Sequence, residues 1–208
     1  MHSKPKELSV SRVLLRNMLN RLLVGKGAPR YAERIYVDPR TVQAITMKHK
    51  HPVGWDRTSS GRIVRNWPTD LVVPITEHEK IRYCLLHWNT GLSWEESGAY
   101  EWYTNAGAGK SARLPDRLKL LDAVFQQVAR EGRLRSVRDL KGSAYLEERG
   151  VRINIGPSGE LVFVDGGSHR LAIAIALGLA KIPAQLGVVH REFADKLSVY
   201  RELHVPRE

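Results

Sequence analysis

The sequence contains a single cysteine, Cys84, among its 208 residues. A lone cysteine excludes an internal disulfide framework and any zinc or iron-sulfur site built from several thiolates. Cys84 falls on the apolar side of a predicted helix, where a thiol is usually inert, so we interpret it as a core residue and not as a nucleophile. This sparing use of cysteine favours a reducing, cytoplasmic location.

Long apolar runs are also missing from the chain. The longest, from Leu171 to Leu177, is far shorter than the roughly 18 to 20 residues that cross a bilayer. The apolar stretch near the N-terminus lacks the small-residue cleavage site of a secretory signal. We therefore expect no membrane partner and no cleaved leader. An apolar content of 42% nevertheless suffices for one packed domain with a short appendage.

Acidic residues are scarce relative to basic ones, with 22 Asp and Glu against 33 Lys and Arg, for a net charge of +11. The excess is confined to two segments. Residues 1–34 carry 8 basic and 2 acidic side chains, and residues 110–141 carry 9 basic and 4 acidic ones. Clustered cations suit a nucleic-acid backbone, because they release its counterions. They are equally typical of solvated helix faces, and both interpretations stay open here.

Residue periodicity predicts a chain that contains both helices and strands. Helices are expected over 10–23, 77–87 and 117–131, and from the end of the turn 165–170 to about 177. Strands are expected over 34–37, 151–155, 161–164 and 182–189. The first of these helices has Val10, Leu14, Met18 and Leu22 on one stripe, which indicates a packed outer helix or a basic arm. Three tryptophans at helix positions, Trp88, Trp94 and Trp102, are expected to fill a core and not to stack on bases.

The most informative segment is the turn Asp165-Gly166-Gly167-Ser168-His169-Arg170, which joins a buried strand to a helix that is apolar on every side. Glycines permit close backbone approach, and the first turn of the helix offers unpaired amides and a positive dipole end. Ser168 can cap the helix or donate to a phosphate, His169 can donate or shuttle a proton, and Arg170 can hold two oxygens. The turn therefore predicts an anion site. A plain strand-to-helix turn, with Ser168 as the cap and Arg170 paired to an acid, remains the alternative.

The same residues, followed by Leu177-Gly178 and Ile182-Pro183, resemble the signature of the ParB/sulfiredoxin superfamily. The likeness covers residues 151–190 and extends more weakly to the strand that ends at Asp38-Pro39. It implies an α+β domain of ParB/sulfiredoxin type over 35–208, with a small mixed sheet, surrounding helices and a helical insertion at about 49–112. Residues 1–34 would form a basic N-terminal helix and arm. Members of this superfamily bind nucleotide phosphates at this turn, so Gly166, Gly167, Ser168, His169 and Arg170 are the expected nucleotide-binding residues.

This chain differs from individual branches of the superfamily, and the differences reduce the number of activities that the resemblance implies. Sulfiredoxins carry a cysteine where this chain has Ser168, and partition proteins continue into a helix-turn-helix domain, whereas 18 residues follow His190. The branch that phosphorylates free serine is the most similar in chemistry. It implies ATP or another nucleoside triphosphate with Mg²⁺ as the bound ligand, and a small-molecule hydroxyl as the acceptor. The expected catalytic residues are Asp165, His169 and Asp38.

Other signals carry less weight. Residues 104–111 nearly spell a P-loop, but Thr104 stands where its first glycine should be and no buried strand precedes it. His49 and His51 lack a third ligand at a useful spacing, so we expect no protein-bound metal. The alternative to a nucleotide-binding enzyme is a DNA-binding ParB-like module that uses segments 1–34 and 110–141 without catalysis. A non-catalytic partner protein with the same fold is a third hypothesis.

Overall fold

The structure is a computed structural model that describes residues 8–46, 57–67, 72–107, 113–141, 146–147, 150–164 and 166–201. Its helices are α1 (Val10–Val24), α2 (Glu79–Thr90), α3 (Ala99–Asn105), α4 (Leu114–Glu131), α5 (Val137–Lys141), α6 (Ser168–Ala176) and α7 (Ser198–Arg201). Its strands are β1 (Arg34–Val37), β2 (Ala44–Thr46), β3 (Ile63–Val64), β4 (Val72–Pro74), β5 (Val151–Ile155), β6 (Leu161–Val164) and β7 (Ile182–His190). Short 3₁₀ helices are η1 (Pro39–Thr41), η3 (Arg57–Ser59), η5 (Ile75–Glu77) and η6 (Arg191–Phe193).

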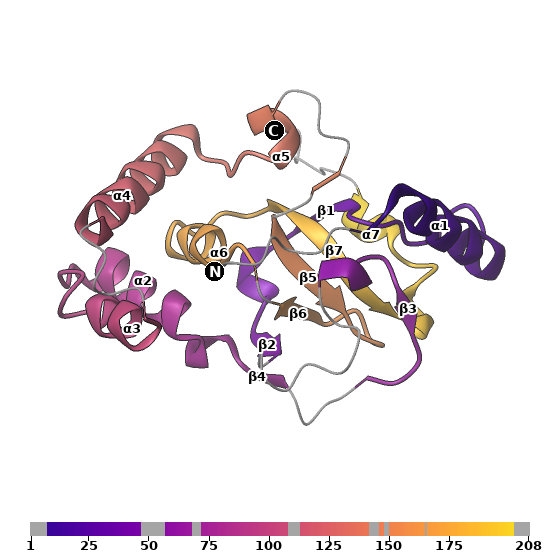
Figure 1. The fold of residues 1–208 in the computed structure, drawn as a ribbon, viewed down its shortest axis with the longest axis horizontal. Helices are drawn as coiled ribbons and strands as arrows, with labels where there is room; N and C mark the ends of the chain where they lie inside the picture. The colour runs from indigo at the N-terminus through magenta and orange to yellow at the C-terminus, as the bar shows by residue number, and fades with distance from the viewer. Residues whose placement is uncertain are drawn as a thin grey trace.

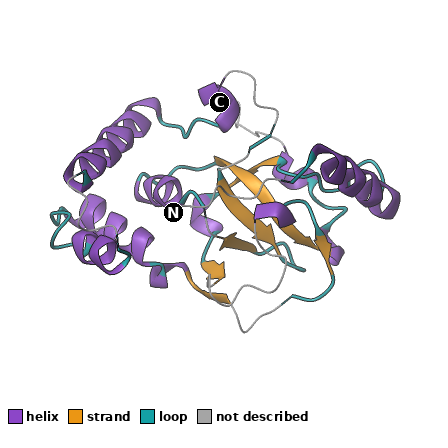
Figure 2. Ribbon diagram, viewed as in Figure 1, coloured by secondary structure: helices purple, strands orange, loops and turns teal. Residues whose placement is uncertain are grey.

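The described strands form one mixed sheet in the order β1-β7-β5-β6-β2-β4, with β3 paired to β7. The hairpin β5–β6 is antiparallel and β5 runs parallel to β7, so the sheet combines both kinds of pairing. Figure 2 shows these strands gathered between helices on either side. The α+β prediction is confirmed. The helical insertion expected at 49–112 does contain α2 and α3, yet β3 and β4 from the same range belong to the main sheet.

Helix α6 lies between the sheet and the helices α2 and α4 (Figure 1). Leu171, Ala172, Ile173 and Ala174 are all buried, as expected for a helix that is apolar on every side. Its neighbours in the core are the fully buried strand residues of β5, β6 and β7. The start of α6 is thereby held in a fixed position against the end of β6. Among the described residues, no helix has the length and apolar character needed to cross a membrane.

A single carboxylate ties α4 to α2 and the segment that follows it. Asp122 accepts hydrogen bonds from the indole nitrogens of Trp88 at 3.0 Å and Trp94 at 2.9 Å, and its Oδ1 lies 3.1 Å from Nε2 of His87. Trp88 also stacks on Phe125 of α4, with ring centroids 4.7 Å apart. Together with Trp102, these tryptophans are partly buried and pack against the core, which confirms the prediction that they serve packing.

Helix α1 packs with its polar side inward, contrary to the expectation of a buried apolar stripe. Asn20 is its buried residue, and the Asn20 amide donates to the carbonyl oxygens of Pro29 and Gly61, each at 2.7 Å. Arg16 donates to the carbonyl oxygen of Ser60 at 2.9 Å. The apolar stripe faces solvent instead, with Leu22 76% exposed. The stripe prediction was wrong because unpaired backbone carbonyls in the neighbouring loops need donors, which leucine cannot supply.

This packing predicts that Asn20 matters more to stability than the leucines of α1. Asn20→Ala removes two buried hydrogen bonds and leaves two carbonyl oxygens unpaired, so we expect it to lower the free energy of unfolding by about 1–3 kcal/mol. Leu22→Ala, on the exposed side of the same helix, should change it by less than about 0.5 kcal/mol. Urea denaturation of both variants checks this. A larger loss for Leu22→Ala would show that the apolar side is the packed one.

Candidate phosphate site at the start of helix α6

The turn before α6 is built on two glycines with positive φ angles, 118° at Gly166 and 75° at Gly167. A Cβ at position 167 would lie 2.9 Å from both the Cα and the N of Val151, closer than real Cβ atoms approach backbone. Gly167 therefore satisfies two constraints at once, a left-handed backbone and contact with the first residue of β5. The predicted tight turn is present, and it fixes where α6 begins.

Gly167 occupies the N-cap position of α6, and Ser168 is the first residue of the helix. The expectation that Ser168 caps the helix was wrong: the cap has no side-chain hydrogen bond, and Ser168 is buried at 7% exposure. The first helical bond runs from the Leu171 amide to the Gly167 carbonyl oxygen at 2.9 Å. Within the described part of the chain, the amides of residues 168–170 receive no hydrogen bond acceptor. This leaves donors at the positive end of the helix dipole, as an anion site requires.

The side chain of His169 points towards α2, where its Nε2 lies 3.0 Å from the hydroxyl oxygen of Tyr83. Burial lowers the pKa of His169 to about 4, assisted by the positive charges of Lys80, Arg117 and His78. The imidazole is therefore neutral at pH 7. Burial also raises the pKa of Tyr83, whose hydroxyl stays protonated and can donate to Nε2 of the neutral ring.

Cationic and aromatic side chains surround this histidine. Lys80 lies over the ring of Trp102 at 4.4 Å from the centroid, and Arg117 over the ring of Tyr103 at 5.2 Å. Tyr103 is buried, and its ring centroid lies 6.4 Å from that of Tyr83. Sequence reasoning missed Lys80, Tyr83 and Arg117, because α2 and α4 reach α6 only through tertiary packing. The one available signal was a lysine and a tyrosine one turn apart on a predicted helix.

Arg170 turns away from His169, towards the segment after α4. Its guanidinium donates to the carbonyl oxygen of Arg135 and lies near the carboxylate of Glu147, which is buried at 1% exposure. Burial raises the pKa of Glu147, whose Oε1 also accepts from the Val137 amide at 2.9 Å. Arg170 thus braces the start of α6, the role weighed above as an alternative. A guanidinium has five N–H donors, so this contact does not use all of them.

Of the two acids predicted to be catalytic, Asp38 and Asp165, the structure describes only Asp38. Asp38 caps η1, which packs against α6, and its carboxylate is engaged by the Arg40 guanidinium at 2.6–3.1 Å. That pairing lowers the pKa of Asp38. Asp165, His49 and His51 lie outside the described residues, as do positions 108–111 of the P-loop-like segment. Asp38 therefore lies at the start of η1, and this 3₁₀ helix contacts α6, the helix that begins at the 166–170 turn. Among the residues it describes, no group of three or more His, Cys, Asp or Glu could hold a metal ion.

Cys84 is fully buried on α2, and burial raises the pKa of its thiol, which bears out its interpretation as a core residue. Comparisons of the chain with protein-family models, curated proteins and solved structures found no match. The resemblance to the ParB/sulfiredoxin superfamily stays a prediction that rests on the residues of the turn. What the structure adds is the surroundings of that turn: buried aromatic rings, several cations and a neutral imidazole.

The close approach at Gly167 yields a prediction on stability. Gly167→Ala places a methyl group 2.9 Å from the β5 backbone and also strains a positive φ, so we expect a loss of about 2–4 kcal/mol in the free energy of unfolding. Gly178→Ala is the matched control, because Gly178 has a φ of 61° and a Cβ at this position would have no atom within 4 Å. It should cost about 1 kcal/mol, from φ alone. Equal losses would show that the contact with Val151 is unimportant.

The lowered pKa of His169 predicts that the protein loses stability as the pH is lowered. Its pKa drops from 6.5 in the unfolded chain to about 4 in the fold, so between these values the unfolded state binds more protons. The neutral ring makes its whole contribution to the free energy of unfolding above pH 6.5. This contribution, on the order of 3 kcal/mol, is lost as the pH falls towards 4. Glu147, with its raised pKa, contributes a slope of opposite sign. The test is to measure the free energy of unfolding against pH for the wild type and for His169→Gln, which should lack the loss caused by His169. If the two curves run parallel, His169 does not have the lowered pKa.

Proposed function

We propose that the protein binds the phosphates of a nucleoside triphosphate, such as ATP with Mg²⁺, at the start of α6. The observation that carries this proposal is the neutral His169 beside unpaired helix amides, in a field to which Lys80 and Arg117 contribute. Among the described residues, none of the charges that shift the pKa of His169 is an acid. A polyanion that approaches these cations gains strong charge-assisted hydrogen bonds.

The chemical character of His169 supports a role as a hydrogen-bond donor to phosphate. A base with a pKa of about 4 is poorly matched to proton abstraction at pH 7. With Nε2 accepting from Tyr83, the other ring nitrogen carries a proton that it can donate.

The finer part of the proposal is phosphoryl transfer to a small-molecule hydroxyl, as in the serine-kinase branch that the turn resembles. The hydroxyl oxygen would bond to the terminal phosphorus, the bond from that phosphorus to the bridging oxygen would break, and the hydroxyl proton would pass to a carboxylate. Asp38 and Asp165 are the candidates for that carboxylate. Mg²⁺ would be held mainly by phosphate oxygens, since it needs few protein ligands when phosphates supply oxygen atoms.

A thermal-denaturation screen of ATP, ADP and CTP with Mg²⁺ tests the proposal. A ligand at about 100 times its dissociation constant stabilises the fold by about 2.7 kcal/mol. We expect Arg117→Gln to weaken binding roughly tenfold or more, because a charged hydrogen bond contributes about 1.5–3 kcal/mol. Lys119→Gln on the same helix is the matched control and should bind as wild type does. Arg117 is preferred to Arg170 for this purpose, because Arg170 also braces the fold.

Two results would count against nucleotide binding at this site. The first is the absence of any stabilisation by the three nucleotides. The second is equal weakening by Arg117→Gln and Lys119→Gln, which would indicate diffuse attraction to a basic surface. An NMR titration gives an independent readout, since a bound polyphosphate should raise the pKa of His169 from about 4 by favouring the imidazolium.

A further inference from the structure

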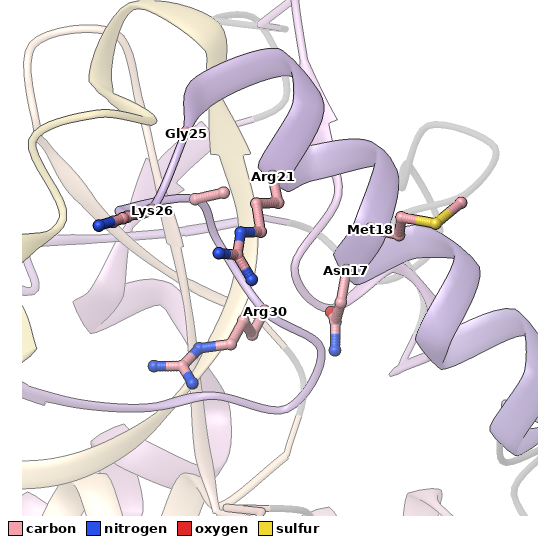
Figure 3. Close-up of a pocket in the computed structure, with 7 residues that line it drawn as sticks. Asn17, Met18, Arg21, Gly25, Lys26 and Arg30 are labelled. Atoms are coloured by element: carbon pink, nitrogen blue, oxygen red, sulfur yellow. The ribbon is translucent and has the colours of Figure 1, made fainter.

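A second basic pocket lies at the far side of the molecule, under helix α1. It has a volume of about 440 Å³ and is lined by α1 and by the segment that follows it, through Asn17, Met18, Arg21, Gly25, Lys26, Ala28 and Arg30. Figure 3 shows Arg21 extending from the helix into the space above Arg30, with Lys26 at the side. The lining therefore holds three cations and no acid.

Two of the three charges in this pocket are not neutralised by any residue that the structure describes. The side chains of Arg21 and Lys26 form no hydrogen bond or ion pair within that part of the chain. Arg30 lies 3.6 Å from Glu33, but the Glu33 carboxylate is held more closely by Arg201, whose Nε lies 2.6 Å from Oε1. Residues 8–30 include no acidic side chain at all. Converging cations repel one another, and an anion bound near Arg21 and Lys26 would relieve this repulsion.

The backbone that carries these cations is fixed by hydrogen bonds. Arg201 donates to the carbonyl oxygens of Gly27 and Ala28, each at 2.9 Å, and Asn20 donates to that of Pro29 at 2.7 Å. At the end of the segment, the Tyr31 amide donates to Asn17 Oδ1 at 2.9 Å. The segment after α1 is thus braced at four successive points. A preorganised frame lowers the entropy cost of binding, because only the cationic side chains need to be ordered.

We propose that this pocket is a binding site for the phosphodiester backbone of duplex nucleic acid. Its donors are the guanidinium and ammonium groups that dominate backbone contacts. No aromatic ring lines it, so it offers no platform for stacking unpaired bases, and contacts through phosphate alone carry no sequence information. The site is independent of the proposed nucleotide site at α6, and either one can exist without the other.

Fluorescence anisotropy with a labelled 20-base-pair duplex, measured over a series of salt concentrations, tests the site. The affinity of the wild-type protein should fall with salt, with a slope of about 0.9 for each phosphate neutralised. We expect the double variant Arg21→Gln/Lys26→Gln to bind at least about tenfold more weakly at low salt and to reduce that slope by about one to two. Both side chains are exposed, so the variant should melt at the wild-type temperature.

Arg12→Gln is the matched control, because Arg12 lies on the same helix, is also exposed and does not line the pocket. It should weaken duplex binding far less than the double variant does. Equal weakening per charge removed would overturn the proposal in favour of diffuse attraction. So would unchanged duplex binding by the double variant combined with a loss of pyrophosphate binding, which would identify a pocket for free phosphate compounds. Arg117→Gln should leave duplex binding at this pocket intact, which separates it from the α6 site.

Discussion

The contact between Gly167 and the backbone of Val151 is the constraint on which the candidate site depends. It sets the start of α6 within van der Waals distance of β5, and any side chain at position 167 would force the two apart. Because α6 is buried along its length, this contact also determines which groups its first turn faces. Helix α2, with Tyr83, packs on one side of that turn, and the segment after α4, with Arg135, on another. The open amides of the turn and the side chains around it therefore form one geometrical unit.

Much of the fold could be predicted from periodicity. The hairpin β5–β6 and helix α6 were expected within a residue or two, because apolar runs bounded by glycine leave few alternatives. The orientation of α1 could not be predicted, since periodicity identifies an apolar side but not the loop carbonyls that Asn20 satisfies. In the site, the glycine turn was evident from the sequence. The position of Arg117 was not, because it depends on how α4 packs, more than 50 residues from His169.

The two consecutive residues His169 and Arg170 show why a motif alone does not determine chemistry. Both were expected to hold phosphate oxygens. In the structure they diverge, His169 towards Tyr83 and Arg170 towards Arg135 and Glu147, because successive residues of a helix point about 100° apart. The cations around His169 come instead from Lys80 and Arg117, on helices distant in sequence. The positive charge around His169 therefore depends on how α2 and α4 pack against α6, and the basic residues of such a site need not all belong to the motif.

The two basic sites differ in how strongly solvent screens them. At α6 burial is the main cause that shifts the pKa of the His169 imidazole to about 4, and the nearby cations add to it, so this imidazole is poorly solvated. In the α1 pocket, Arg21 and Lys26 are exposed, so water and salt reduce their mutual repulsion and their attraction for a ligand. Phosphate binding at α6 should therefore persist at salt concentrations that abolish it under α1. This difference suits the α6 site to a compact polyphosphate, and the open α1 site to a long polyanion that neutralises several charges along its surface.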